Sequence, residues 1–365
     1  MTEQLEPIVF SNSIRLSGRQ WIFVWLFAVT FVMLAPAAWT RFEDFTLEPD
    51  YRIPYELSND YWLYERFAAL AVREYDTLVI GDSVIWGAYV KRQETLPHYL
   101  NREAGKERFA NLGLDGAHPL ALTGLVQHYA GSVRNRKVVL ECNPLWMSSL
   151  RLDLQEEKEL NEFNHTDLVP QFWPRIPRYK KEISPRLGVL VEQRVTFSKW
   201  VRHLQQAYYS QNDFPSWTLA HPYENPLEPL TRALPPSGNE LRHLQQPWFT
   251  DKPKDDYDWI DLDTSLQWHA FQEVVELLQD RGNRVFVVVG PFNEHMLTAP
   301  SLKRYGKVKA TIAAWLEEKQ VPYKMPAPLA SEQYGDASHP LPQGYAELAK
   351  QLYREPFFRS AETAK

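Results

Sequence analysis

The sequence has a single cysteine, Cys142, among 365 residues. One cysteine cannot form an internal disulfide, and it excludes a metal site built mainly from thiolates. The chain also lacks a glycine-rich phosphate loop, a His-Glu-x-x-His zinc motif and internal repeats. A formal net charge of −6 without a basic stripe argues against a nucleic-acid partner. What remains is a globular composition, 44% hydrophobic, with enough apolar surface for a full core.

One long apolar segment, from Trp21 to Trp39, has no charged residue and is flanked by Arg19 and Arg41. As a helix, its 19 residues would extend about 28 Å, close to the ~30 Å thickness of the hydrocarbon core of a bilayer. Tryptophan at both ends suits the two membrane interfaces. We therefore expect residues 21–39 to form a transmembrane helix.

The charges beside this segment favour a cytoplasmic N-terminus, residues 1–20, and an extracytoplasmic, periplasmic remainder held at the cell membrane by a single pass. Arg15 and Arg19 precede the segment, and acidic residues follow it: Glu43, Asp44, Glu48 and Asp50. Two alternatives stay open. Ala35-Pro36-Ala37 could be a signal-peptidase site, which would make the segment a cleaved leader. A buried core helix is less favoured because the segment has no polar face.

The rest of the chain alternates between strand and helix patterns, which predicts a parallel five-stranded sheet with helices on both faces. After a tether and a lead-in helix in residues 40–75, the expected strands lie near 77–82, 108–112, 137–142, 284–289 and 321–325. The expected helices lie near 95–104, 119–130, 264–281, 305–319 and 343–354.

The alternation stops over residues 145–261, which are too many for a plain loop. We expect an insert with a helix near 189–209 and a proline-rich aromatic stretch over 214–259. Such an insert could cap the carboxyl edge of the sheet. Its tryptophans could contact sugar rings, but for most of them we favour a role in the core of the insert.

Two short motifs about 250 residues apart carry the chemistry. Gly81-Asp82-Ser83 follows the first expected strand, and Asp336-Ala337-Ser338-His339 lies near the end of the domain. A serine hydroxyl attacks an ester only if a histidine takes its proton, and a carboxylate must hold that histidine in the correct tautomer. Ser83, His339 and Asp336 therefore form a candidate catalytic triad, which needs neither a metal nor a cofactor.

Further residues at expected strand ends could bind an oxyanion. Gly116 lies in a glycine-rich turn after the second strand, and Asn143 follows the third. Since ligands of open α/β sheets bind at the carboxyl ends of the strands, the backbone N–H groups of Ser83 and Gly116 and the amide of Asn143 could donate to one oxyanion. Asp82, Asn293 and His295 are candidate substrate contacts by the same argument.

These four blocks, with Ser83, Gly116, Asn143 and His339, resemble those of the SGNH, or GDSL-type, hydrolase superfamily. The resemblance covers roughly residues 75–145 and 283–355 and implies a flavodoxin-like, three-layer α/β/α domain over 76–144 and 262–358. One block departs from the family, because Glu141-Cys142-Asn143-Pro144 replaces the usual Gly-x-Asn-Asp. The layout of one helix and an external domain is also similar to that of accessory proteins of polysaccharide O-acylation.

Each motif also has an ordinary structural interpretation, since Gly-Asp-Ser, Asn-Pro and glycine-rich segments are common in turns, and Asp336 could cap the next helix. Four blocks in the family's order favour catalysis. The resemblance implies an esterase that acts on an acylated carbohydrate or another ester. The alternatives are an O-acyltransferase of an envelope polysaccharide, working with a multi-spanning membrane acyltransferase, and a non-catalytic carbohydrate-binding or assembly protein.

Overall fold

The computed structural model describes residues 16–157, 163–237, 245–250 and 252–360. The expected cytoplasmic segment 1–20 thus lies mostly outside the described residues. The chain divides into two compact units, Met1–Asp44 and Phe45–Lys365, each of which is described by itself.

The described part of the first unit consists mainly of one helix, α1 (Gly18–Phe42). It is longer at both ends than the expected 21–39. It begins earlier because the Ser17 side chain accepts a hydrogen bond from the backbone N–H of Gln20. Among the described residues, this is the helix whose length and apolar composition would allow it to cross a membrane. By those criteria it could be a membrane anchor or a signal sequence.

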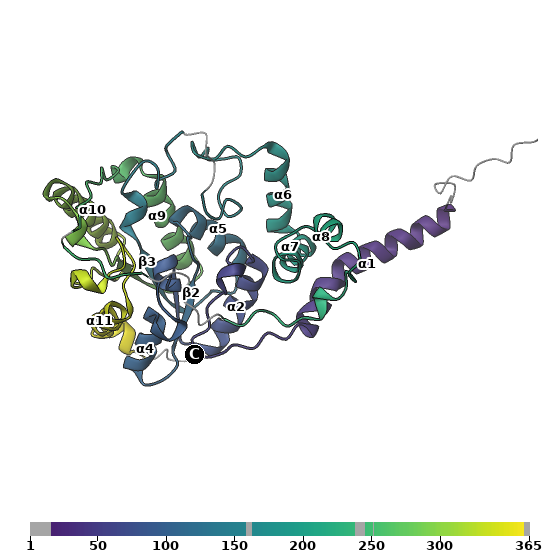
Figure 1. Ribbon diagram of the computed structural model, residues 1–365, viewed down its shortest axis with the longest axis horizontal. Helices are drawn as coiled ribbons and strands as arrows, with labels where there is room; N and C mark the ends of the chain where they lie inside the picture. The colour runs from purple at the N-terminus through teal and green to yellow at the C-terminus, as the bar shows by residue number, and fades with distance from the viewer. Residues whose placement is uncertain (1–15, 158–162, 238–244, 251, 361–365) are drawn as a thin grey trace, which may run out of the picture. The chain divides into compact units, whose positions relative to one another are not determined.

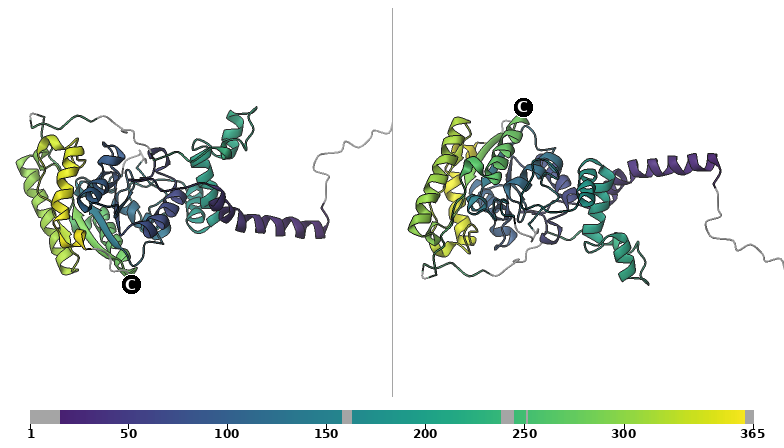
Figure 2. Two further views of the ribbon diagram at one scale, coloured as in Figure 1. Left: turned by 90° about the horizontal axis from the view of Figure 1, so that it is seen from below. Right: turned by 90° about the horizontal axis from the view of Figure 1, so that it is seen from above.

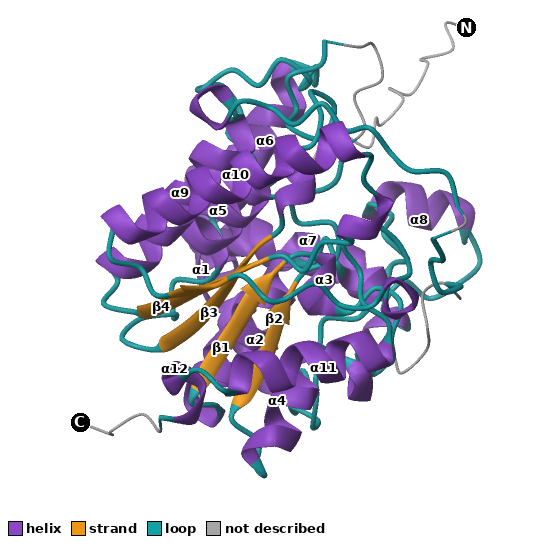
Figure 3. Cartoon of the chain, turned by 90° about the vertical axis from the view of Figure 1, so that its left-hand side faces the viewer, coloured by secondary structure: helices purple, strands orange, loops and turns teal. Residues whose placement is uncertain are grey.

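The second unit is built on a five-stranded sheet in which every pairing is parallel, in the order β2-β1-β3-β4-β5. The sheet confirms the predicted α/β class. The strands are β1 (Thr77–Gly81), β2 (Phe109–Gly113), β3 (Lys137–Cys142), β4 (Arg284–Val289) and β5 (Tyr323–Lys324). Only β5 is much shorter than expected. Figure 3 shows the strands side by side with helices on both faces.

Alternate residues of β1 face two separate cores, which explains why its whole sequence is apolar. Leu78 and Ile80 pack with the helices of one face, and Val79 packs with those of the other. The first face holds α2 (Tyr61–Glu74), α5 (Pro119–Tyr129), α9 (Leu266–Asp280) and α10 (Ala299–Glu318). The second holds α4 (Leu96–Ala104), α11 (Pro342–Tyr353) and the short α12 (Pro356–Arg359). Cys142 is fully buried in the first core.

In the described residues of the insert after β3, the α-helices are α6 (Ile183–Arg194), α7 (Thr196–Tyr208) and α8 (Phe214–Ala220). The single helix predicted near 189–209 was wrong, because the chain leaves the helical conformation at Val195. Helix α7 docks on the lead-in helix through Lys199–Glu65 and the fully buried pair His203–Asp60. Figures 1 and 2 show α6, α7 and α8 on the opposite side of this unit from α10 and α11.

The tryptophans of the insert region mostly serve packing. The buried ones are Trp200, Trp217, Trp248 and Trp259, whereas Trp173 is 86% exposed. Two irregular segments of the insert reach the sheet's carboxyl edge. The Asn164 amide lies against Gly116, and Trp248 donates its backbone N–H to the carbonyl of Tyr334, next to the Asp336 loop.

Candidate active site

Ser83 is the first residue of a one-turn helix, α3 (Ser83–Trp86), that directly follows β1. Asp82 caps this turn by accepting the Val84 N–H at 2.7 Å. Gly87 ends it with a φ of +90°, a conformation that glycine adopts without strain. The strand–turn–helix geometry leaves the Ser83 side chain at the carboxyl edge of the sheet, the position expected for it from the sequence.

A buried arginine from the tether holds the far end of this turn. Arg52, 1% exposed, donates to the carbonyls of Trp86 and Gly87 at 2.8 and 2.7 Å. It also donates to Val90 at 3.1 Å. The carbonyls at the end of the helical turn are thereby satisfied by a cation, and the nucleophile turn is fixed to the chain that precedes the sheet.

The C-terminal motif lies directly against Ser83. His339 Nε2 is 2.8 Å from Ser83 Oγ, and His339 Nδ1 is 2.9 Å from both carboxylate oxygens of Asp336. Asp336 Oδ1 also accepts the backbone N–H groups of Ser338 and His339, at 3.0 and 2.9 Å, which folds the four residues into a tight turn. The structure thus joins the three residues in one chain of hydrogen bonds, although 256 positions separate Ser83 from His339.

The electrostatics suit a base that is oriented by a carboxylate. Burial raises the pKa of Asp336, but His339 and the hydrogen bonds to the carboxylate outweigh it and lower that pKa to about 2. Burial lowers the pKa of His339, whereas the charge and hydrogen bond of Asp336, aided by Asp82 and Asp115, raise it above its usual 6.5. Asp336 is therefore ionised at neutral pH, and its charge would stabilise an imidazolium at His339.

Tyr89 is a functional candidate that the sequence did not reveal. Its hydroxyl donates to Asp336 Oδ2 at 2.8 Å, and its ring meets the His339 ring edge-on with centroids 4.9 Å apart. This contact spans 247 positions, so local spacing carries no signal for it. Tyr89 satisfies the outer oxygen of Asp336 and limits the rotation of the imidazole.

Asn143 contacts the nucleophile motif through its side-chain amide, which donates to Asp82 Oδ2 at 2.8 Å. Because an amide nitrogen carries two hydrogens, one remains for an oxyanion. Trp146 Nε1 donates to the same carboxylate oxygen at 2.7 Å. Gly116 has a φ of +74°, and a Cβ there would lie 2.2 Å from the Asn164 amide nitrogen, so no other residue fits without movement. Asn143 is thus joined to the Gly-Asp-Ser motif, and the assignment of Asn143 and Gly116 to an oxyanion site stays a prediction.

Glu141, at the position where the resemblance expects glycine, lies under the nucleophile turn. It is 2% exposed, and its Oε2 accepts the Asp82 N–H at 3.1 Å. Burial, and then the nearby Asp82 carboxylate, raise the pKa of Glu141 well above its usual value. This raised pKa favours the protonated form of Glu141, whose side chain fills the space that a glycine would leave at the end of β3.

The three candidate substrate contacts have different surroundings. Asp82 and Asn293 are 1% and 0% exposed, so neither side chain reaches a surface that a substrate would touch. Asn293 instead supports the loop that carries Asp336. Its backbone N–H donates to the Ala337 carbonyl at 2.8 Å, and its side-chain amide donates to the backbone carbonyl of Asp336 at 3.4 Å. His295 is partly exposed but bonds through Nε2 to the Leu329 carbonyl at 3.0 Å. We assign Asp82 and Asn293 to positioning the loops.

Within the part of the chain that the structure describes, no group of three or more His, Cys, Asp or Glu side chains could hold a metal ion. No protein-family model matches this sequence, and no curated protein is significantly similar to it.

Proposed function

We propose that the protein is a serine esterase of the SGNH type, which cleaves acyl esters, with an acylated carbohydrate as the favoured substrate. The observation that carries this proposal is the continuous chain Ser83–His339–Asp336, with contacts of 2.8 and 2.9 Å. A parallel sheet that presents these residues at its carboxyl edge supports it. A structural turn would not need a carboxylate and an imidazole aligned on one hydroxyl.

The reaction follows from this geometry. Ser83 Oγ attacks the ester carbonyl carbon while His339 Nε2 takes its proton, and the carbonyl oxygen becomes an oxyanion. The Ser83 and Gly116 N–H groups and the free amide hydrogen of Asn143 donate to this oxyanion. His339 then protonates the alcohol oxygen as the bond between that oxygen and the carbonyl carbon breaks, and the acyl group remains on Ser83. Water, deprotonated by His339, attacks the acyl-enzyme and releases the carboxylic acid.

We further propose that α1 is a retained anchor, with a cytoplasmic N-terminus and the catalytic unit in the periplasm. The apolar length of the helix and the charges on its flanks support this orientation. Anchoring would raise the local concentration of the catalytic unit at an envelope substrate or beside a membrane acyltransferase.

The test is hydrolysis of p-nitrophenyl acetate by the full chain in detergent micelles. Ser83→Ala and His339→Ala should each lower kcat/KM by about 10³-fold or more, because the two residues act as one unit. His295→Ala is the matched control, since His295 bonds to a backbone carbonyl outside the triad. Full activity in Ser83→Ala, or a loss in His295→Ala but not in His339→Ala, would overturn the assignment.

A further inference from the structure

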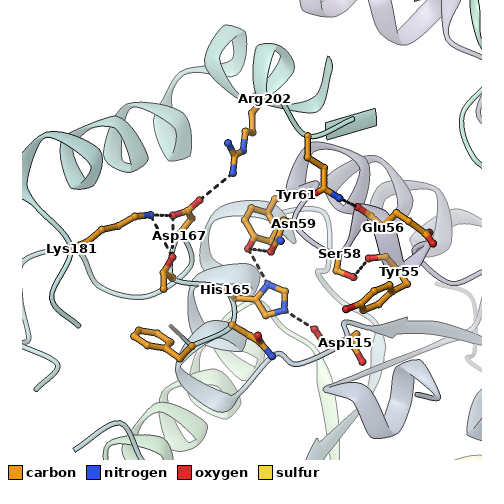
Figure 4. A pocket seen from close by; sticks show the side chains of 14 residues that line it. Tyr55, Glu56, Ser58, Asn59, Tyr61, Asp115, His165, Asp167, Lys181 and Arg202 are labelled. Carbon is orange, nitrogen blue, oxygen red and sulfur yellow. Dashed lines mark hydrogen bonds and ion pairs between the residues drawn. The ribbon is translucent and has the colours of Figure 1, made fainter. Parts of the chain in front are cut away.

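A polar pocket of about 490 Å³ lies beside the candidate active site, within the range of about 300–1,000 Å³ that small-molecule sites occupy. Its walls come from three parts of the chain: the end of the tether and start of α2, the glycine-rich turn, and the insert. The lining used below comprises Tyr55, Glu56, Asn59, Asp115, Asn164, His165, Asp167, Lys181, Arg202 and Gln211. Figure 4 shows several of these side chains around the pocket.

The pocket borders the glycine-rich turn and packs against the helical turn that begins at Ser83. Asp115 is a lining residue that immediately precedes Gly116, and its charge contributes to raising the pKa of His339. The Asn164 amide lies against Gly116. On the nucleophile side, the Tyr55 ring packs edge-on against Trp86 of α3, with centroids 6.2 Å apart. A molecule in this pocket would therefore lie next to both the nucleophile turn and the glycine turn.

The charged residues of the pocket are acidic in sum rather than cationic, with Glu56, Asp115 and Asp167 against Lys181 and Arg202. Asp167 pairs with Lys181 at 2.9 Å and with Arg202 at 3.7 Å, so both cations already face a carboxylate (Figure 4). Glu56 and Asp115 add two further acidic groups. His165 is buried between the Tyr61 hydroxyl and the Asp115 carbonyl, and its burial lowers its pKa, which leaves it neutral. This distribution disfavours an anionic ligand such as a uronate chain.

The exposed groups of the pocket suit hydroxyl groups instead. Asn59, Asn164 and Gln211 present exposed side-chain amides, each of which both donates and accepts hydrogen bonds, as a sugar hydroxyl does. The Tyr55 ring, 41% exposed, offers an aromatic surface for the apolar face of a sugar ring. Gln211 is anchored at the rim, because its amide donates to the Glu56 carbonyl at 3.0 Å.

We propose that this pocket binds the alcohol part of the ester, and that this part is a neutral, hydroxyl-rich glycosyl unit. The assignment rests on the proposed esterase function, and it gives the insert a role in substrate selection. The same subsite would hold the sugar whether the sugar is the leaving group in hydrolysis or the acceptor in acyl transfer, because the two steps are the reverse of each other.

The first experiment compares two acetate esters on the full chain in detergent micelles: a monoacetylated methyl hexoside and p-nitrophenyl acetate, which carries no sugar. Asn59→Ala and Gln211→Ala should each lower the ratio of the two kcat/KM values, sugar ester over p-nitrophenyl ester, by about tenfold. The matched control is Gln127→Ala, an exposed amide on α5 outside the pocket, which should leave both values unchanged. An unchanged ratio in both pocket variants would overturn the proposal.

The second experiment measures binding without turnover. Neutral tetrasaccharides of glucose, mannose and galactose, in α and β linkages, are titrated calorimetrically into the full-length Ser83→Ala variant, with tetragalacturonate as the anionic comparison. At least one neutral sugar should bind, and Asn59→Ala combined with Gln211→Ala should weaken it about 100-fold. Binding of tetragalacturonate alone, or of none of the sugars, would refute the pocket assignment. Sugar binding by a protein that cleaves neither ester would refute the esterase proposal and leave the pocket assignment standing.

Discussion

Asp336→Asn tests the triad more finely than Ser83→Ala, because it keeps the shape of the side chain while it removes the charge and replaces one acceptor oxygen with a donor nitrogen. In the wild type, both carboxylate oxygens lie 2.9 Å from His339 Nδ1, which therefore carries the proton and leaves Nε2 free to accept from Ser83. Asparagine can keep the Oδ1 contacts with the backbone N–H groups of Ser338 and His339. Its amide nitrogen would then take the place of Oδ2.

The amide nitrogen is a donor where the wild type has an acceptor. Facing His339 Nδ1, it favours the tautomer with the proton on Nε2, which cannot accept the Ser83 proton. Loss of one charge-assisted hydrogen bond costs about 1.5–3 kcal/mol, or roughly 10- to 150-fold in rate. With the tautomer penalty added, kcat/KM should fall by about 10²- to 10⁴-fold, less than for Ser83→Ala because the base itself remains.

The pH profile separates this mechanism from a loss of folding. His339 acts only when neutral, and Asp336 raises its pKa, so wild-type kcat/KM should rise with pH to a plateau and be half-maximal above pH 6.5, the usual histidine pKa. Without the carboxylate, the pKa of His339 falls and the acidic limb should move to lower pH. The assay is p-nitrophenyl acetate hydrolysis from pH 5 to 9, with circular dichroism as a folding control. An acidic limb that stays at the wild-type pH in a folded variant would refute the reasoning.

Three further results are expected. Tyr89→Phe removes the hydroxyl that donates to Asp336 and should lower kcat/KM about tenfold with little change in KM; an unchanged kcat would show that Tyr89 has no part in orienting the triad. The pKa of Glu141 is raised well above its usual 4.5 in the folded protein, so above about pH 4.5 the folded state holds this proton more tightly than the unfolded chain, and the contribution of Glu141 to stability falls as pH rises. Glu141→Gln should remove this contribution and, in thermal melts, gain stability over the wild type as pH rises from 5 to 8, whereas Glu141→Ala should lose about 1–3 kcal/mol; parallel pH curves for wild type and glutamine variant would contradict a raised pKa of Glu141. The mature protein should retain residues 21–39, and N-terminal sequencing that begins at Ala38, with release by a salt wash, would show a cleaved leader instead.

Much of the fold could be predicted from the sequence because its signals are local. Apolar β-branched runs such as Val285–Val289 predict buried parallel strands. The order of the strands in the sheet depends on which strands pair, and residue spacing alone does not determine that pairing. The two motifs could be identified because each keeps its chemistry within a few residues. Their contact at 2.8 Å required the fold.

The features that escaped prediction depend on long-range packing. The helix predicted over 189–209 is interrupted at Val195, a residue with no breaker signal of its own. Tyr89 and Arg52 act through partners that are distant along the chain or in another element, so no spacing rule includes them. Composition could not separate exposed aromatic residues from buried ones: Trp173 is 86% exposed, whereas Trp217, in α8, is 4% exposed.

The most direct test of the central claim is to identify the residue that becomes acylated. The full chain in detergent micelles is treated with a fluorophosphonate, which reacts with serines activated by a neighbouring base, and the labelled peptide is sequenced by mass spectrometry. We expect the label on Ser83, no label in Ser83→Ala, and labelling slowed by about 10³-fold in His339→Ala. A label on another residue, or none on folded wild-type protein, would contradict the assignment of Ser83 as the nucleophile.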